Sequence, residues 1–172
     1  GQDTYASALE SGIYDICKKY SVDFVDLKKQ KFNKYKIDIA PGYIEVSSLL
    51  LEDNYLINIP KLKTVHATPV SLTIKNLKGV ISDRSKKDFH RYALEDLLLE
   101  LSKLVKPDLN VIDGMISLSL QQPIQTRLVV ISTLFEKLDS YIAESLGIGW
   151  KNISYLRKKF GSLNRLKNIV EH

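Results

Sequence analysis

The sequence has little of what covalent or metal-centred chemistry requires. A single cysteine, Cys17, stands among 172 residues. One thiol cannot form a disulfide within the chain or a cysteine-only metal site, and an iron–sulfur cluster would need ligands from elsewhere. No run approaches the ~20 apolar residues that cross a bilayer, and the first residues do not resemble a signal peptide. We therefore expect a cytoplasmic protein with no membrane partner and no iron–sulfur cluster within this chain.

The common enzyme motifs are also missing. We find no phosphate-binding glycine fingerprint, no nucleophile elbow and no nucleotide-binding lysine loop, so whether the chain is an enzyme stays open. Its composition, 44% hydrophobic and 26% charged, is that of an ordinary globular protein, and its length predicts a single domain over residues 1–172. The net charge of +5 favours phosphate-bearing or acidic partners. The basic residues are scattered, which is typical of a solvated surface and disfavours nucleic-acid binding.

Hydrophobic periodicity predicts the first elements. Apolar residues recur every three or four positions from Thr4 to Tyr20, which indicates one amphipathic helix with a buried stripe, capped by Thr4. Residues 22–27 alternate as a strand. Two short strands, 35–39 and 43–46, flank a Pro-Gly turn and predict a small antiparallel insert near residues 35–46.

Strands and helices then alternate. We expect a buried central strand over Tyr55–Ile59 that Pro60 ends, and a strand over Leu109–Ile112 that delivers Asp113 and Gly114 at its carboxyl end. Further elements are expected as follows: helices over 69–78, 92–105, 134–146 and 150–160, an uncharged connection over 118–125, and strands over 127–132 and 166–170. This order predicts an α/β fold with a mixed, mostly parallel sheet and helices on both faces.

Basic and amide side chains gather around the predicted end of the strand at Pro60. They are Lys61, Lys63, Lys75 and Asn76. Open α/β sheets place ligands at the carboxyl ends of their strands, where ammonium groups and amides suit a phosphate or a carboxylate. We therefore predict that these four residues bind an anionic small molecule. Alternatively, the lysines are surface residues and Asn76 turns the chain before Gly79.

Three residues are candidates for catalysis: His66, His90 and Asp113. Histidine moves protons near neutral pH, and an aspartate can orient it or act as a base. The three could meet if their loops are neighbours in the sheet. They lack the local spacing of metal ligands, so no metal site is predicted. Asp113 could instead begin a tight turn, and His90 could simply start the long helix.

Several segments resemble one known family in order and spacing. They are Asn58–Thr64, Ser71–Gly79, Phe89-His90, Lys106–Leu109, Val111–Gly114, Asp139 and Leu146-Gly147. The chain is similar here to the family called domain of unknown function 362, over roughly residues 5–172. Members usually begin with a further segment carrying an Ile-Lys-Pro-Asn motif, which we do not find, so the chain resembles the C-terminal two-thirds of the family domain. Some members are iron–sulfur proteins fused to ferredoxin-like modules, which implies a redox link.

The sequence departs from the family pattern at three places. Lys-Thr-His becomes Lys63-Thr64-Val65, the Gly-Pro after the aspartate becomes Gln122-Pro123, and Asp-Pro before the last major helix becomes Leu134-Phe135. These departures support an alternative function, a non-catalytic interaction or assembly domain with a degenerate site. The chain could also pair with a second copy of itself or with a ferredoxin-like partner.

Overall fold

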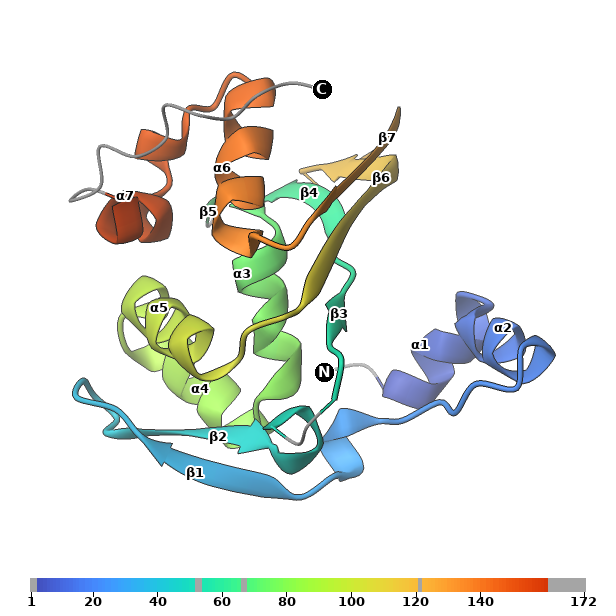
Figure 1. Ribbon diagram of the computed structural model, residues 1–172, viewed down its shortest axis with the longest axis horizontal. Helices are drawn as coiled ribbons and strands as arrows, with labels where there is room; N and C mark the ends of the chain where they lie inside the picture. Colours follow the sequence, from blue (N-terminus) through green and yellow to red (C-terminus); the bar gives the residue numbers. More distant parts are fainter. Residues whose placement is uncertain (1–2, 52–53, 66–67, 121, 161–172) are drawn as a thin grey trace.

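The fold centres on a five-stranded sheet in a computed structural model that describes residues 3–51, 54–65, 68–120 and 122–160. Strand β6 runs through its middle (Figure 1). It pairs in parallel with β3 and β4 along one edge and antiparallel with β7 along the other, while β5 pairs antiparallel with β4. The strands are β3 (Ile57–Asn58), β4 (Lys61–Val65), β5 (Thr68–Ser71), β6 (Leu109–Ser119) and β7 (Gln122–Ser132). Three strands thus share one direction, and the expected α/β class with a mixed sheet is confirmed.

Helices pack on one face of this sheet and build the core with it. Their bounds are α3 (Thr73–Asn76), α4 (Asp83–Arg91), α5 (Leu94–Leu104), α6 (Phe135–Ser145) and α7 (Ser154–Phe160), with the 3-10 turns η3 (Leu77–Val80) and η4 (Trp150–Asn152). In α5 the spacing of Leu97, Leu98 and Leu101 places all three side chains in the core, fully buried. The helix predicted over 92–105 is confirmed. The helix predicted over 150–160 is divided into η4 and α7.

The small antiparallel insert is confirmed as β1 (Phe32–Lys36) and β2 (Tyr43–Ser47). Gly42 adopts a φ of 89°, a left-handed conformation that glycine tolerates, at the turn between them. Ile44 and Val46 are buried, and Val46 forms a bridge to Ile81 just before α4. The insert therefore closes the lower end of the helical layer (Figure 1), and η2 (Ser48–Leu51) follows it.

The predicted long N-terminal helix is wrong in three respects. Gly12, at a φ of 74°, divides it into α1 (Thr4–Glu10) and α2 (Ile13–Lys19), and Asp3 rather than Thr4 caps it by accepting from the Ala6 N–H. Its apolar stripe is mostly exposed rather than buried. No strand forms over 22–27, where the chain is extended before the 3-10 turn η1 (Leu27–Lys29). The periodicity of apolar residues predicts an amphipathic helix, but it does not predict which part of the protein covers the apolar side of that helix.

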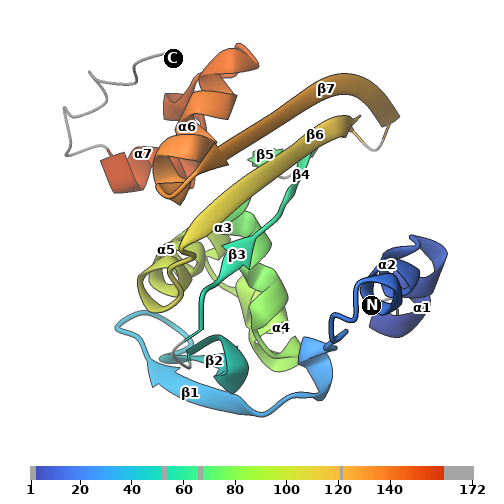
Figure 2. The ribbon, with the colours of Figure 1, turned by 45° about the vertical axis from the view of Figure 1, so that its right-hand side comes forward.

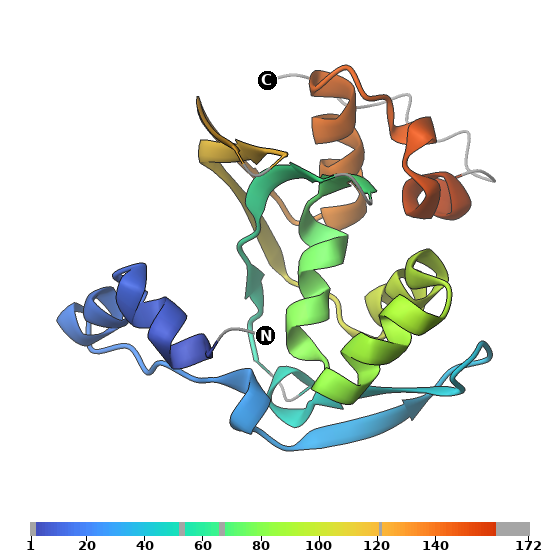
Figure 3. The same cartoon turned by 180° about the vertical axis from the view of Figure 1, so that it is seen from behind.

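The two groups of helices lie on opposite sides of the sheet. Figure 1 shows α3 to α7 against one side and α1 and α2 on the other, set apart from the sheet, and Figure 3 shows the same arrangement from behind. The only face of the sheet that a described helix covers closely is the one toward α3 to α7. None of the helices within the described ranges has the length and apolarity needed to cross a bilayer.

Several strand ends differ from the prediction. Pro60 does not end the sheet edge: its carbonyl accepts the Asp113 N–H at 2.9 Å, and the edge resumes as β4. Residues 55–59 are not a buried central strand, because alternate side chains there point to solvent. The strand over 109–112 continues to Ser119, since β4 and β7 both pair with it.

Three further predicted elements, a connection, a strand and a helix, are also revised. Residues 118–119 and 122–125 belong to the paired strands β6 and β7 rather than to a connection, and the strand predicted over 127–132 begins at Gln122. The helix predicted from Pro69 begins at Thr73, because Pro69 lies in β5, which pairs antiparallel with β4. The strand predicted over 166–170 lies outside the described residues.

Candidate functional site

A cluster of lysines lies where β4, α3 and η3 meet. We call it the lysine cluster: Lys63 of β4, Lys75 of α3 and Lys78 of η3. Partial burial lowers the pKa of the Lys75 ammonium below its usual range, and the positive charges of Lys78 and Lys63 lower it further. Burial likewise lowers the pKa of Lys78, with a contribution from Lys86. The fold therefore holds these positively charged ammonium groups close together in a partly buried environment.

His90 lies at the margin of the lysine cluster. Its Nε2 atom is 3.4 Å from the Nζ of Lys78, and that ammonium also lies 5.8 Å from the centre of the Phe89 ring. Lys86 of the same helix pairs with Asp83 at 3.5 Å. Helix α4 thus brings the His90 imidazole next to the Lys78 ammonium, and Lys86 lies one turn before His90 on the same helix. This places one of the three catalytic candidates beside Lys78, a member of the lysine cluster that was not among the four predicted ligand residues.

Asn76 takes part in an amide network with two buried asparagines, Asn58 and Asn110. Its Nδ2 donates to the Asn58 Oδ1 at 2.8 Å, and the Asn58 Nδ2 donates to the Thr73 carbonyl at 3.1 Å and to the Asn110 Oδ1 at 3.0 Å. Asn58 and Asn110 sit side by side on the parallel strands β3 and β6. The network ties α3 to the sheet, which fixes the position of Lys75.

The second structural anchor of α3 is Asp139, which belongs to α6. The Asp139 carboxylate accepts from the Thr73 N–H at 2.9 Å, the Thr73 hydroxyl at 2.5 Å, the Ile74 N–H at 3.2 Å and the Tyr155 hydroxyl at 3.2 Å. It therefore supplies the acceptors that the first amides of α3 lack within their own helix. Burial raises the pKa of Asp139 to about 6, although each of these hydrogen bonds opposes the rise.

Our sequence prediction gave Asn58, Asn110 and Asp139 no role. Asn58 and Asn110 each interrupt a short apolar run, Ile57-Asn58-Ile59 and Leu109-Asn110-Val111. A polar residue at the inward phase of such a strand is a usable signal, because a buried amide needs a partner. Asp139 carries no such signal, since its partner Thr73 lies 66 residues away in the sequence.

Lys61 and Asp113 form their own pair on the sheet. The Lys61 Nζ lies 2.5 Å from the Asp113 Oδ2, and the two residues are register partners on β4 and β6. The hydrogen bond from Lys61 lowers the pKa of the Asp113 carboxyl, and the Met115 N–H adds to the effect by donating to its other oxygen. The Lys61 ammonium is thus directed to a carboxylate, while Lys63 contributes charge near Lys75.

The predicted sites are therefore only partly assembled. Lys63 and Lys75 come together with Lys78, whereas Lys61 contacts Asp113 and Asn76 lies in the amide network. His90 and Asp113 belong to different groups, on α4 and on the sheet, and His66 lies outside the described residues. Among the residues that the structure describes, no three His, Cys, Asp or Glu side chains are placed to hold a metal ion.

The exposed Lys61–Asp113 pair is expected to add little stability. Both side chains are more than a third exposed, so solvent screens their attraction. In a double-mutant cycle with Lys61→Met and Asp113→Asn, measured by urea unfolding, we expect a coupling of no more than about 1 kcal/mol. Whatever stability the pair supplies should be lost as the pH falls through the lowered pKa of Asp113. A coupling of several kcal/mol would contradict this.

Comparison with known proteins gives the family of the chain. Residues 1–144 match the model of the family described as Domain of unknown function (DUF362). The chain belongs to this family. The match covers the lysine cluster, the amide network and Asp139, and it ends within α6.

A curated relative is a Synechocystis sp. protein named Thylakoid-associated protein sll1697. The two sequences are 28% identical over 82 residues, which cover 44% of this chain and 26% of the relative. The chain thus spans about a quarter of the length of that protein. No solved structure matches the chain.

Proposed function

We propose that this domain binds an anionic small molecule at the lysine cluster. The observation that carries the proposal is that three partly buried lysines, Lys63, Lys75 and Lys78, lie near one another, and their burial and adjacent charges lower the pKa of Lys75. Holding these cations together costs free energy that a bound phosphate or carboxylate would offset by pairing with the ammonium groups. Groups with perturbed pKa values cluster at functional sites of proteins.

The supporting residues have distinct parts in this proposal. Lys63, Lys75 and Lys78 contact the anion, while Asn76 acts indirectly by holding α3 in place through Asn58. Lys61 is directed to Asp113 and contributes only long-range charge. His90, 3.4 Å from Lys78, is the group placed to exchange a proton with a bound ligand. Roles for His66 and Asp113, the redox link, a ferredoxin-like partner and a cytoplasmic location stay predictions.

Inorganic phosphate and pyrophosphate test the proposal directly. We expect either anion to raise the unfolding temperature at low ionic strength, because a ligand that binds the folded chain stabilises it. Lys63→Ala and Lys75→Ala should each weaken binding by about tenfold, a loss typical of one charge-assisted contact. The measurement is a thermal-shift titration followed by calorimetry.

Lys87→Ala is the matched control for these variants. Lys87 lies exposed on α4, so the substitution removes the same charge from the neighbouring surface. It should leave phosphate binding almost unchanged. If all three variants weaken binding equally, anion binding depends on the net charge of the chain alone and does not occur at the lysine cluster.

The second candidate function is an assembly domain, and one observation favours it. Large apolar side chains are exposed in two places, along α1 and α2 and over one face of the sheet. Contiguous apolar surface of this kind marks interaction sites in proteins. Anion binding and assembly do not exclude each other, because the lysine cluster and these surfaces involve different residues.

A further inference from the structure

One face of the central sheet is apolar and uncovered. We call it the open face: Ile57, Ile59, Leu109, Val111, Val129 and Ile131. The strand register places these side chains together, since Ile57 pairs with Leu109 and Val111 with Ile131. Ile59 and Ile131 are 60% and 61% exposed. The opposite face carries Leu62 and Ile112, which are buried against the helices.

The second uncovered apolar surface lies on the N-terminal arm, residues 3–20. Tyr5 and Tyr14, with ring centres 4.9 Å apart, meet edge to face and hold α1 against α2 together with Phe24. Ile13, Ile16 and Tyr20 follow each other at three and four residues and form a stripe along α2. Ile16 is 57% exposed and Tyr20 65% exposed. The arm is therefore an amphipathic hairpin whose apolar side has no cover in the described chain.

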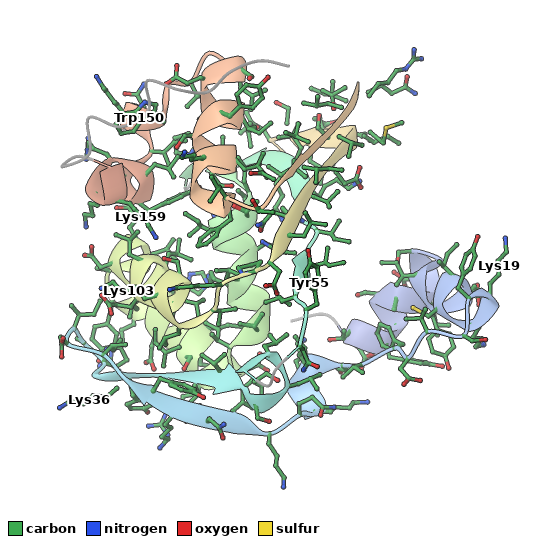
Figure 4. All side chains as sticks on the ribbon, in the orientation of Figure 1. Lys19, Lys36, Tyr55, Lys103, Trp150 and Lys159 are labelled. Atoms are coloured by element: carbon green, nitrogen blue, oxygen red, sulfur yellow. The ribbon has the colours of Figure 1, made fainter. Side chains whose placement is uncertain are left out.

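The arm stands clear of its own sheet. Figures 1 and 2 show α1 and α2 beyond the side of the sheet that α3 to α7 leave open, joined to β1 by an extended segment. Figure 4 labels Lys19 at the outer part of the arm and Tyr55 beside β3, well apart from each other in this view. The arm and the open face are thus two surfaces of one chain that each need an apolar partner.

We propose that the arm of one copy packs on the open face of a second copy, and that the contact is reciprocal. A two-fold arrangement of this kind covers both arms and both open faces at once, which is how an isologous dimer satisfies two surfaces of one chain. The helical arm would supply the second helical layer that an α/β sheet otherwise has on its uncovered face.

Charge does not oppose this pairing. Although the whole chain carries +5, the arm carries −1, because Asp3, Glu10 and Asp15 outnumber Lys18 and Lys19 by one. At the edge of the open face, Lys61 and Asp113 neutralise each other at 2.5 Å. Both surfaces are therefore apolar and carry little net charge, as the centre of a protein interface does. A nucleic acid or an acidic protein would not be matched to either surface.

Molar mass in solution is the first test. We expect light scattering of the intact chain at micromolar concentration to give twice 19.6 kDa. Ile16→Gln on the arm and Ile131→Gln on the open face should each weaken the dimer at least about tenfold, because each places a polar group at the centre of the contact. Glu10→Gln is the control on the arm and should leave the dimer intact. A monomer for the unaltered chain would overturn the proposal.

Cysteine cross-linking identifies which surfaces meet. Cys17 lies on α2 and is the only cysteine of the chain. A chain with Cys17 is mixed with a differently tagged chain that carries Cys17→Ser and Val129→Cys. Oxidation should yield a disulfide between the two tags, whereas a second partner with Cys17→Ser and Lys87→Cys, on α4, should not react.

The outcome of cross-linking decides the proposal even where a variant folds poorly. A disulfide between the tags at Val129→Cys but not at Lys87→Cys supports arm exchange. A chain carrying both Cys17 and Val129→Cys that cross-links only within itself would show that the arm closes on its own sheet, and would overturn the proposal. A dimer in which Cys17 forms no disulfide with Val129→Cys, either between chains or within one chain, would also overturn the proposal.

Discussion

Replacement of Asp139 by alanine is expected to destabilise the fold by about 3–5 kcal/mol, the range for removing one partner of a buried charged network. The carboxylate is fully buried and accepts from Thr73, Ile74 and Tyr155. Without it, the Thr73 and Ile74 amides remain buried with no acceptor, and each unsatisfied group costs about 1–3 kcal/mol. Because α3 begins at these amides, the loss should also displace Lys75 and weaken phosphate binding.

Urea unfolding measures this loss, and Tyr155→Phe is its control. Phenylalanine removes one hydroxyl donor to Asp139 at 3.2 Å but keeps the buried ring. We expect it to cost about 1 kcal/mol, the value of a single hydrogen bond. Equal, small losses for Asp139→Ala and Tyr155→Phe would mean that Asp139 does not anchor α3.

The pH dependence of stability gives the Asp139 prediction a second readout. Its pKa is raised to about 6 in the fold from an ordinary value of 3.8. The folded state therefore binds a proton more tightly than the unfolded chain, so this group stabilises the fold fully below pH 3.8, and that stability is lost as the pH rises through about 6. In Asp139→Asn this slope between pH 4 and 6 should be absent. An unchanged slope would assign the titration to other groups.

Gly114→Ala is expected to cost about 1–3 kcal/mol, the range for overfilling a packed interior. A Cβ at this position would meet the Leu128 carbonyl oxygen at 2.9 Å and the Leu62 side chain at 3.0 Å. The carbonyl belongs to β7 and cannot move without disturbing its pairing with β6. For a chain of this size, that loss corresponds to a fall in Tm of roughly 2–4 °C per kcal/mol.

Gly79→Ala is the control for Gly114→Ala. Nothing lies within 4 Å of a Cβ built at Gly79, which is in η3 beside the lysine cluster. Alanine should be neutral there or slightly stabilising, because it lowers the entropy of the unfolded chain. If both substitutions destabilise the fold alike, the close approach of β6 and β7 at Gly114 is not the cause.

The sequence prediction singled out the position of Gly114, but for the wrong structural reason. The sequence Asp113-Gly114 after an apolar run predicted a strand end carrying a site residue. The structure places both residues within β6, where the glycine admits β7 and the aspartate pairs with Lys61. A strand between two partners runs on past a turn-forming dipeptide because hydrogen bonds on both edges hold it extended.

Local sequence determined the elements whose signals are local. The leucine spacing of α5, the Pro-Gly turn of the β1–β2 insert and the alternation of strands and helices predicted the α/β class correctly, because periodicity and turn chemistry act within a few residues. The sequence also placed Lys63 and Lys75 in one candidate site.

Tertiary structure alone decided the rest. Only the packing of α3 between the sheet and α6 shows that Asn76 joins Asn58 and Asn110, and that Asp139 caps a helix 66 residues earlier in the chain. Only the register of β4 and β6 pairs Lys61 with Asp113, and only the packing of the elements leaves the open face and the arm uncovered. These features depend on contacts between distant segments, and an apolar stripe in a sequence does not specify the surface that will cover it.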